Sequence, residues 1–160
     1  MPFAGGCQDE VPFSSPTFQG FMRVVIDTNV LTGAFRSRSG ASFQVLVLMH
    51  AGQLLPLVST TLFSEYEAVM KRPEQRAVSG LSEADVDDIL AIIANLAQGV
   101  HIYFRWRPQL IDPGDEMVLD AAVNGRAEAV ITYNVRHLKD ACRRFGIPVM
   151  TPADLLRRLV

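Results

Sequence analysis

Three acidic residues stand at separate points of the chain, each next to a segment with a regular hydrophobic pattern. Asp27 directly follows the apolar run 24–26, Glu65 lies early in a predicted helix, and Asp115 lies near the start of another. If these carboxylates converge in the fold, each pair a few ångströms apart repels by roughly 4 kcal/mol at an effective dielectric near 20. They then stay ionised together only around a shared cation. Oxygen ligands, with no cluster of Cys or His, favour Mg²⁺ or Mn²⁺ over zinc.

Each of the three acids also has an ordinary structural explanation. Asp27 and Asp115 could cap the helices that they precede, and Glu65 could simply be solvated. Spacing favours Glu65 over Glu67. Glu65 adjoins the apolar stripe of its helix, whereas Glu67 lies roughly 200° around the helix axis from Glu65. Asp115 shares a helix face with Leu119, four positions further on, so we expect it to point toward the sheet.

Polar residues beside these acids are candidates to hold a metal-bound water or a phosphate. Thr28 and Asn29 follow the first acid directly, and Thr132 and Asn134 follow another apolar run. Asn134 could equally cap the next helix. We predict Asn134 as a fourth catalytic residue, and Thr28, Asn29 and Thr132 as supports for water or phosphate. Asp120 is a weaker candidate, since it lies off the predicted functional face of its helix.

The hydrophobic pattern puts these residues at the ends of strands and the starts of helices. Short apolar runs predict strands at residues 23–26, 55–58, 129–132 and 147–150. Longer periodic segments predict helices at 42–51, from Thr60 or Thr61 to 71, from Ser82 to about 98, from Gly114 or Asp115 to 124, at 135–145, and from Pro152 onward. Asp85 fits a capping box with Ser82, and Thr151 is the predicted N-cap before Pro152. Strands separated by helices form βαβ crossovers, so we predict an α/β three-layer sandwich with a central, mostly parallel sheet. Ligands bind such sheets at the carboxyl ends of the strands.

Composition separates residues 1–21 from the rest of the chain. This segment contains Pro2, Pro12, Pro16 and a Gly5-Gly6 pair and shows no periodic pattern. We expect it to be a flexible N-terminal leader, followed by one domain over residues 22–160. It has neither the basic start nor the apolar core of a signal peptide.

Charge and cysteine content restrict the class of protein. The formal net charge is −2, so any contact with nucleic acid requires a local basic patch or bound cations. The two cysteines, Cys7 and Cys142, form no CxxC motif and indicate neither a disulfide framework nor a zinc site. No apolar run is long enough to cross a membrane. We therefore expect a cytoplasmic protein.

The order and spacing of these motifs resemble the PIN-domain family over residues 22–152. The matching pieces are the Asp27-Thr28-Asn29 segment, Glu65, the segment from Asp112 to Glu116, and the run Ile131-Thr132-Tyr133-Asn134. Within that family the chain looks most like the VapC-like toxins of type II toxin–antitoxin systems. That resemblance implies a Mg²⁺- or Mn²⁺-dependent endoribonuclease, commonly a homodimer held by a cognate antitoxin, with Asp27, Glu65 and Asp115 as its acidic site.

The chain departs from the family pattern at Asn134, where the family often has an aspartate. An amide oxygen can still coordinate a metal but brings no charge, so a second metal would be held less strongly. Our hypothesis is that one metal held by Asp27 and Asp115 orients and acidifies a water for in-line attack on phosphorus. Glu65 would bind a second metal or assist proton transfer.

Basic residues that could contact RNA lie at three places. Arg36 and Arg38 follow the first predicted strand by about a helical length, the cluster Arg105-Trp106-Arg107 combines guanidinium groups with a stacking aromatic, and Arg136, His137 and Lys139 follow Asn134. Each could instead be a solvated surface group or, for the cluster, arginines lying along a partly buried Trp. His137 is not required as an acid or base.

Two rival functions remain open. A phosphatase could use Asp27 as a covalent nucleophile, although such haloacid-dehalogenase-type enzymes usually carry a second aspartate where this chain has Asn29. Alternatively, a catalytically degenerate PIN fold could bind RNA or a protein partner. The apolar helix at 42–51 could then belong to a dimer or antitoxin interface, although core packing explains it as well.

Overall fold

A central parallel sheet of five strands organises the domain in the computed structural model, which describes residues 20–105, 110 and 112–159. The predicted leader falls almost entirely outside the described residues, as do Trp106 and Arg107 of the predicted basic cluster. The strands are β1 (Met22–Ile26), β2 (Leu54–Val58), β3 (Gln98–Gly99), β4 (Ala129–Ile131) and β5 (Val149–Met150), in the order β3-β2-β1-β4-β5. Every pairing is parallel, as the βαβ pattern predicts.

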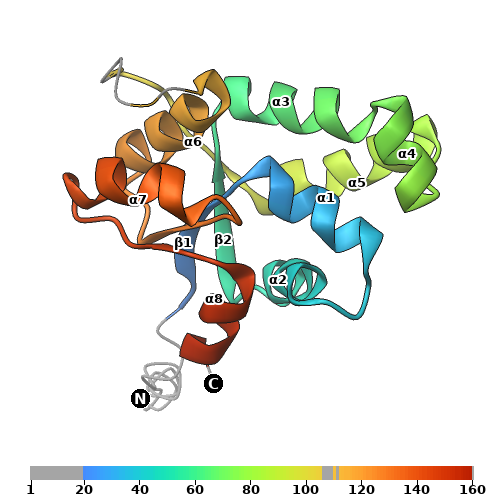
Figure 1. The fold of residues 1–160 in the computed structure, drawn as a ribbon, viewed down its shortest axis with the longest axis horizontal. Helices are drawn as coiled ribbons and strands as arrows, with labels where there is room; N and C mark the ends of the chain where they lie inside the picture. The colour runs from blue at the N-terminus through green and yellow to red at the C-terminus, as the bar shows by residue number, and fades with distance from the viewer. Residues whose placement is uncertain (1–19, 106–109, 111, 160) are drawn as a thin grey trace, which may run out of the picture.

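Eight helices accompany these strands in the described part of the chain. They are α1 (Thr28–Arg36), α2 (Ala41–His50), α3 (Thr60–Met70), α4 (Pro73–Ser79), α5 (Glu83–Leu96), α6 (Pro113–Asn124), α7 (Val135–Arg143) and α8 (Pro152–Leu159). Figure 1 shows α6 and α7 on one side of β1 and β2, and α1 and α2 on the other. This three-layer α/β arrangement confirms the predicted fold class.

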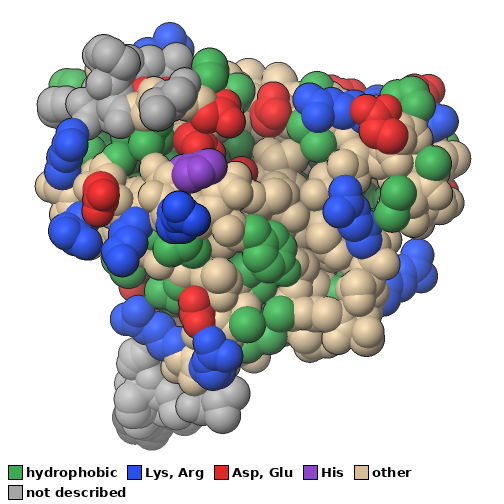
Figure 2. Space-filling view, viewed as in Figure 1, with side chains coloured by type: hydrophobic (Ala, Val, Ile, Leu, Met, Phe, Trp, Pro, Cys, Tyr) green, Lys and Arg blue, Asp and Glu red, His purple; other side chains and the backbone are tan. Residues whose placement is uncertain are grey.

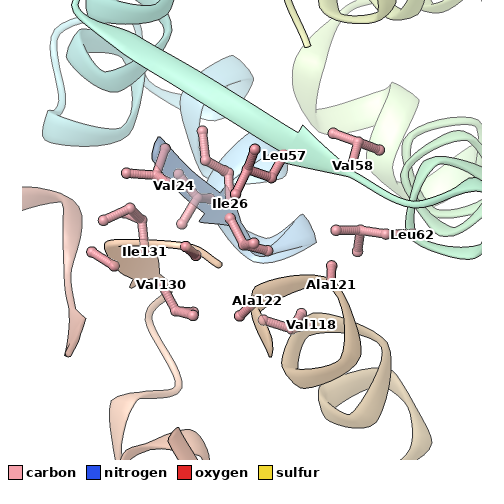
Figure 3. Packing of buried hydrophobic residues seen from close by; sticks show 14 of the residues in the cluster. Val24, Ile26, Leu57, Val58, Leu62, Val118, Ala121, Ala122, Val130 and Ile131 are labelled. Atoms are coloured by element: carbon pink, nitrogen blue, oxygen red, sulfur yellow. The ribbon is translucent and has the colours of Figure 1, made fainter. Parts of the chain in front are cut away.

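The core forms around β1, because both faces of this strand are covered by helices. Val24, Val25 and Ile26 are almost completely buried, which explains why the strand is a continuous apolar run rather than an alternating one. On one face, Val118 and Ala122 of α6 point toward the sheet (Figure 3). The small alanine side chains of α6 allow this helix to lie close to β1, so its first turn is held firmly at the carboxyl end of the sheet.

Two elements were not predicted from the sequence. Strand β3 consists of Gln98 and Gly99, which are both exposed and carry no apolar signal; it pairs with β2 through backbone hydrogen bonds. Helix α4 begins at Pro73, two residues after the predicted end of the preceding helix, at a first helical position where the N–H that proline lacks would have no partner within the helix. No helix in the described residues is long and apolar enough to cross a membrane.

Helix boundaries differ from the predictions by a few residues. Ser59 caps α3 in place of Thr60 or Thr61, and its hydroxyl accepts a hydrogen bond from the backbone N–H of Leu62 (3.1 Å). Asp112 caps α6, so that helix begins one residue before Gly114. Helix α7 ends at Arg143 rather than at 145. The predicted capping box of Ser82 and Asp85, and the predicted cap of α8 by Thr151, are both present.

Helix α2 packs against α1, β2 and α8, as expected for a core element. Val45 and Met49 are buried, whereas Val47 is exposed. Most of its apolar surface is therefore explained by packing within this chain.

Gly125, at the end of α6, permits the close approach between this helix and β2. A Cβ atom at this position would lie 2.8 Å from the Ala121 carbonyl oxygen and 2.9 Å from a methyl group of Val100. We predict that Gly125→Ala lowers the free energy of unfolding by about 1–3 kcal/mol through overpacking. Gly99→Ala is the matched control, since no atom lies within 4 Å of a Cβ there. Urea denaturation would measure both, and equal stability of the two variants would contradict the close packing inferred here.

Candidate active site

The candidate site lies where the connections of the sheet diverge. Strand β1 leads to β2 on one side, whereas β4, on the other side of β1, leads to β5. In open parallel sheets, ligands bind outside the carboxyl ends of the strands at such a point. Asp27 follows β1 and Thr132 follows β4, and the backbone N–H of Asp27 donates to the Ile131 carbonyl oxygen (2.9 Å). Two segments 105 residues apart therefore meet here.

A cleft of about 600 Å³ opens at this point. The predicted residues Asp27, Thr28, Asn29, Glu65, Asp115 and Asn134 all line it, together with Asp112, Arg36, Arg72 and Tyr133. Figure 2 shows acidic side chains gathered where α3 and α6 meet, with basic side chains to either side, over α7 and toward α4. The cleft thus combines negative and positive groups in one hollow.

Asp27 is held by a hydrogen bond from Thr132. The Thr132 hydroxyl is fully buried and donates to the Asp27 carboxylate (2.7 Å), while the same hydroxyl oxygen accepts from the backbone N–H of Asn134 (2.9 Å). Asp27 is the N-cap residue of α1, but its side chain makes no capping hydrogen bond. The backbone N–H groups of Thr28 and Asn29 lie close enough to lower the pKa of this carboxylate, but less than the hydrogen bond from Thr132 does. The start of the helix therefore accounts for only part of the setting of Asp27, which is 8% exposed.

Asp112 takes over the capping role at α6 and leaves Asp115 for the cleft. The Asp112 carboxylate accepts a hydrogen bond from the backbone N–H of Gly114 (2.8 Å). Asp115 is only 5% exposed and lies 3.7 Å from the imidazole Nδ1 of His137. Asp112 belongs to the motif matched to the PIN-domain family but was not predicted as a site residue. Its position three residues before Asp115, at a helix start, was the available signal.

Burial raises the pKa of both Asp27 and Asp115. For Asp27, burial is the main cause, and the hydrogen bond from Thr132 opposes it; the charge of Asp112 raises this pKa further. For Asp115, burial is again the main cause, followed by the charges of Asp27 and Asp112, while His137 acts in the opposite direction. The two carboxyl groups therefore resist being ionised together, and a bound cation would relieve that resistance.

Glu65 reaches the cleft from α3, while Glu67 does not line it. Glu67 is exposed and binds Lys71 (2.9 Å) on the outer face of the helix. Tyr66, between them, is buried, and its hydroxyl donates to the Ile26 carbonyl oxygen at the end of β1. This hydrogen bond ties α3 to the strand that carries Asp27, and so fixes the position of Glu65 relative to it.

The two asparagines organise the loops around the cleft. The Asn29 side-chain oxygen accepts a hydrogen bond from the backbone N–H of Tyr133 (3.2 Å), and its amide donates to the Thr132 hydroxyl (3.4 Å). Asn134 is the N-cap residue of α7, but its side chain makes no capping hydrogen bond. Capping therefore does not explain Asn134, which lines the cleft.

The other residues singled out from the sequence lie elsewhere. Asp120 is buried in α6 and does not line the cleft, and Arg38 and Arg105 are exposed outside it. Arg136 and His137 line an adjoining hollow of about 570 Å³ that shares Asp112 and Asp115 with the cleft.

Within the described ranges, no group of three or more His, Cys, Asp or Glu side chains forms a ready-made metal site. The donors in the cleft nevertheless suit Mg²⁺ or Mn²⁺ in type, since they are carboxylate and amide oxygens. Mg²⁺ usually keeps several waters and binds through one or two carboxylates together with substrate phosphate. Asp27 and Asp115, the two buried carboxylates, fit that mode of binding.

Asp115→Asn should stabilise the metal-free protein at neutral pH. Because the fold raises the pKa of Asp115, its ionisation favours the unfolded state, and this penalty disappears as the pH falls through the raised pKa toward 3.8. We expect an increase of about 0.5–2 kcal/mol at about pH 7 that shrinks near pH 4. Asp85→Asn is the opposite control, since hydrogen bonds from Ser82 lower the pKa of Asp85. Urea denaturation at both pH values measures this, and a destabilised Asp115→Asn protein at neutral pH would contradict it.

Tyr66→Phe should loosen the attachment of α3 to β1. Loss of the buried hydroxyl leaves the Ile26 carbonyl oxygen without this donor, so we expect a loss of about 1–2 kcal/mol in the free energy of unfolding. Tyr103→Phe serves as control, because that tyrosine is exposed. Thermal unfolding of the two variants provides the measurement, and unchanged stability of Tyr66→Phe would show that the hydrogen bond does not anchor the helix.

Comparison with known proteins identifies the family. The family model described as PIN domain matches residues 23–136, which include every acid that lines the cleft. A search of curated proteins finds no match. A similar fold occurs in a chain of the crystal structure of VapBC2 from Rickettsia felis, which is bound to a DNA fragment from the VapBC2 promoter. The TM-score is 0.54 and the sequence identity is 14%, and the match covers 81% of this chain and 98% of that chain. Because the family model spans more than half of its length, this protein belongs to the PIN domain family.

Proposed function

We propose that this protein is an endoribonuclease that hydrolyses RNA phosphodiester bonds with Mg²⁺ or Mn²⁺. The observation that carries the proposal is the buried pair Asp27 and Asp115, whose pKa values are raised by burial and by neighbouring negative charge. Such a pair is unfavourable in a protein that does not bind a cation. Membership of the PIN domain family supports the nuclease class.

Asp27 and Asp115 would hold the ion, and Asn134 would offer a neutral amide oxygen beside it. A divalent ion bound there would supply Lewis-acid stabilisation of phosphate charge and make water a better nucleophile at neutral pH. Thr132 keeps the Asp27 carboxylate oriented through its hydroxyl. Glu65, on the α3 side of the cleft, would accept a proton from the attacking water.

Arg36 and Arg72 give the cleft its affinity for the substrate backbone. Both line the same hollow as the acids, although the chain as a whole has a net charge of −2. Guanidinium groups pair with phosphate oxygens in a planar, bidentate manner. Binding of RNA to this protein would therefore depend on local charge rather than on net charge, and would weaken as salt concentration rises.

We further propose that the protein is the toxin of a toxin–antitoxin pair, acting in the cytoplasm as a homodimer with a cognate antitoxin. The similar fold of a chain in the VapBC2 complex supports this role. A second candidate function is a catalytically degenerate PIN fold that binds RNA or a protein partner. Two observations favour it: the cleft has an amide at Asn134, and the described residues contain no ready-made cluster of three metal-binding side chains.

Metal-dependent cleavage separates these two functions. We expect purified protein to cleave structured or unstructured RNA with Mn²⁺ but not with a chelator, and Asp27→Asn to lower the rate by about 100-fold or more. Mn²⁺ should also raise the melting temperature of the wild type and have little effect on Asp27→Asn.

Glu65→Gln and Glu67→Gln form a matched pair within one helix. Glu65→Gln should lower the cleavage rate strongly, whereas Glu67→Gln should leave it unchanged, since Glu67 binds Lys71 on the outer face. Wild-type protein that binds RNA without any metal-dependent turnover would overturn the nuclease proposal and support the degenerate fold.

A further inference from the structure

Tyr133 is an aromatic side chain on the wall of the acidic cleft. It lies between Thr132 and Asn134, and the residue is 49% exposed. Large exposed aromatic groups beside a polar cleft have an unfavourable contact with water, which a ligand with an apolar face would relieve. The structure around Tyr133 indicates that the ring is held for such a ligand.

Two contacts of the side chain and one of the backbone restrain Tyr133. The Tyr133 hydroxyl is hydrogen-bonded to the hydroxyl of Ser42 on α2, and Ser42 is only 2% exposed. The backbone N–H of Tyr133 donates to Asn29, as described above. The edge of the ring lies against Gly33 of α1, where a Cβ atom would be 3.4 Å from Tyr133 Cε2 and 3.1 Å from Ser42 Oγ. The ring is therefore restrained before any ligand binds, which reduces the entropic cost of binding.

The same cleft carries groups for both parts of a nucleotide chain. Asp27 and Arg36 lie at opposite ends of α1, a separation of roughly 13 Å for nine residues at 1.5 Å each. The acidic end suits a phosphate that shares a divalent ion, and Arg36 and Arg72 suit a further phosphate. Tyr133 adds the aromatic surface on which a base can stack, so the cleft combines groups for the backbone with a stacking surface, as sites for single strands do.

We propose that Tyr133 is a base-stacking subsite, which receives the nucleobase next to the phosphate held at the acidic end while Arg36 and Arg72 bind a neighbouring phosphate. The inference rests on the proposed ribonuclease function and narrows its substrate to RNA with an unstacked base at this position. A base inside a duplex is covered on both faces by its neighbours, so it cannot also stack on Tyr133.

Binding of a short single-stranded oligoribonucleotide, followed by fluorescence anisotropy with Mn²⁺ in the Glu65→Gln background, tests the subsite while turnover is slow and the acidic end keeps both metal-holding carboxylates. We expect Tyr133→Ala to weaken binding by about 5- to 100-fold, the range for loss of one base–aromatic stack. Tyr133→Phe keeps the ring and should bind within about 3-fold of the protein with Tyr133. Tyr103→Ala is the matched control, because that tyrosine is 77% exposed and lies outside the cleft.

A series of oligoribonucleotides, each with one base removed, locates the stacked base. With Tyr133 in place, one abasic position should weaken binding by about as much as Tyr133→Ala does on the intact strand. For Tyr133→Ala, the same position should cause no further loss, since the partner of that base is already gone.

The outcomes separate this inference from the function on which it rests. The subsite is overturned if Tyr133→Ala binds the oligoribonucleotide as tightly as the protein with Tyr133 does. It is also overturned if Tyr133→Phe and Tyr133→Ala weaken RNA binding equally, because the hydroxyl would then only anchor the loop to α2. A penalty spread over all abasic positions also overturns it. Wild-type protein that neither binds nor cleaves RNA overturns both proposals, whereas metal-dependent cleavage with unchanged kcat/KM in Tyr133→Ala overturns the subsite alone.

Discussion

The parallel pairing of β1 with β4 is the constraint on which the site depends. Ile26 lies opposite Ile131, so the next residues, Asp27 and Thr132, leave the sheet side by side and their side chains form a hydrogen bond. The strands beyond this pair lie on opposite sides of it, which leaves room above it for the first turn of α6 and for Asp115. A shift of one residue in this register would turn Asp27 to the other face of the sheet. Both faces of β1 are fully packed, and this packing maintains the register.

The buried acids of the site lower the stability of the folded protein, and the packing of the core has to offset this loss. Two carboxyl groups are buried in the lining of one cleft, and burial raises the pKa of both. Capping could have satisfied them at the starts of α1 and α6, but the N–H groups at the start of α1 do not offset the burial of Asp27, and Asp112 caps α6 instead. A protein tolerates such an arrangement when function requires it, because the well-packed sheet supplies stability elsewhere. Asp112 and Asp115 thus show how one helix start carries both an acid that caps the helix and an acid that lines the cleft.

The buried strands and the helix faces were predictable from sequence, because burial on both sides of β1 leaves a continuous apolar run that ends at Asp27. The choice of Glu65 over Glu67 followed from helix periodicity alone, and the cleft lining agrees with it. Strand β3 was not predictable, since its two exposed residues pair only through the backbone. The setting of Tyr133 was also hidden, because it depends on Ser42, 91 residues away, and on the absence of a side chain at Gly33.

Asn134 acquires a physical explanation from the same electrostatics. A carboxylate at this position would add negative charge to a cleft in which the charges of Asp27 and Asp112 already raise the pKa of Asp115. The neutral amide avoids that further repulsion while keeping an oxygen that can face a cation. If the cleft binds a metal as proposed, its total charge for attracting that metal is weaker, and the phosphate of the proposed RNA substrate would have to supply a larger share of the ligands. Metal and substrate would then bind to this cleft cooperatively, each increasing the affinity for the other by the same factor.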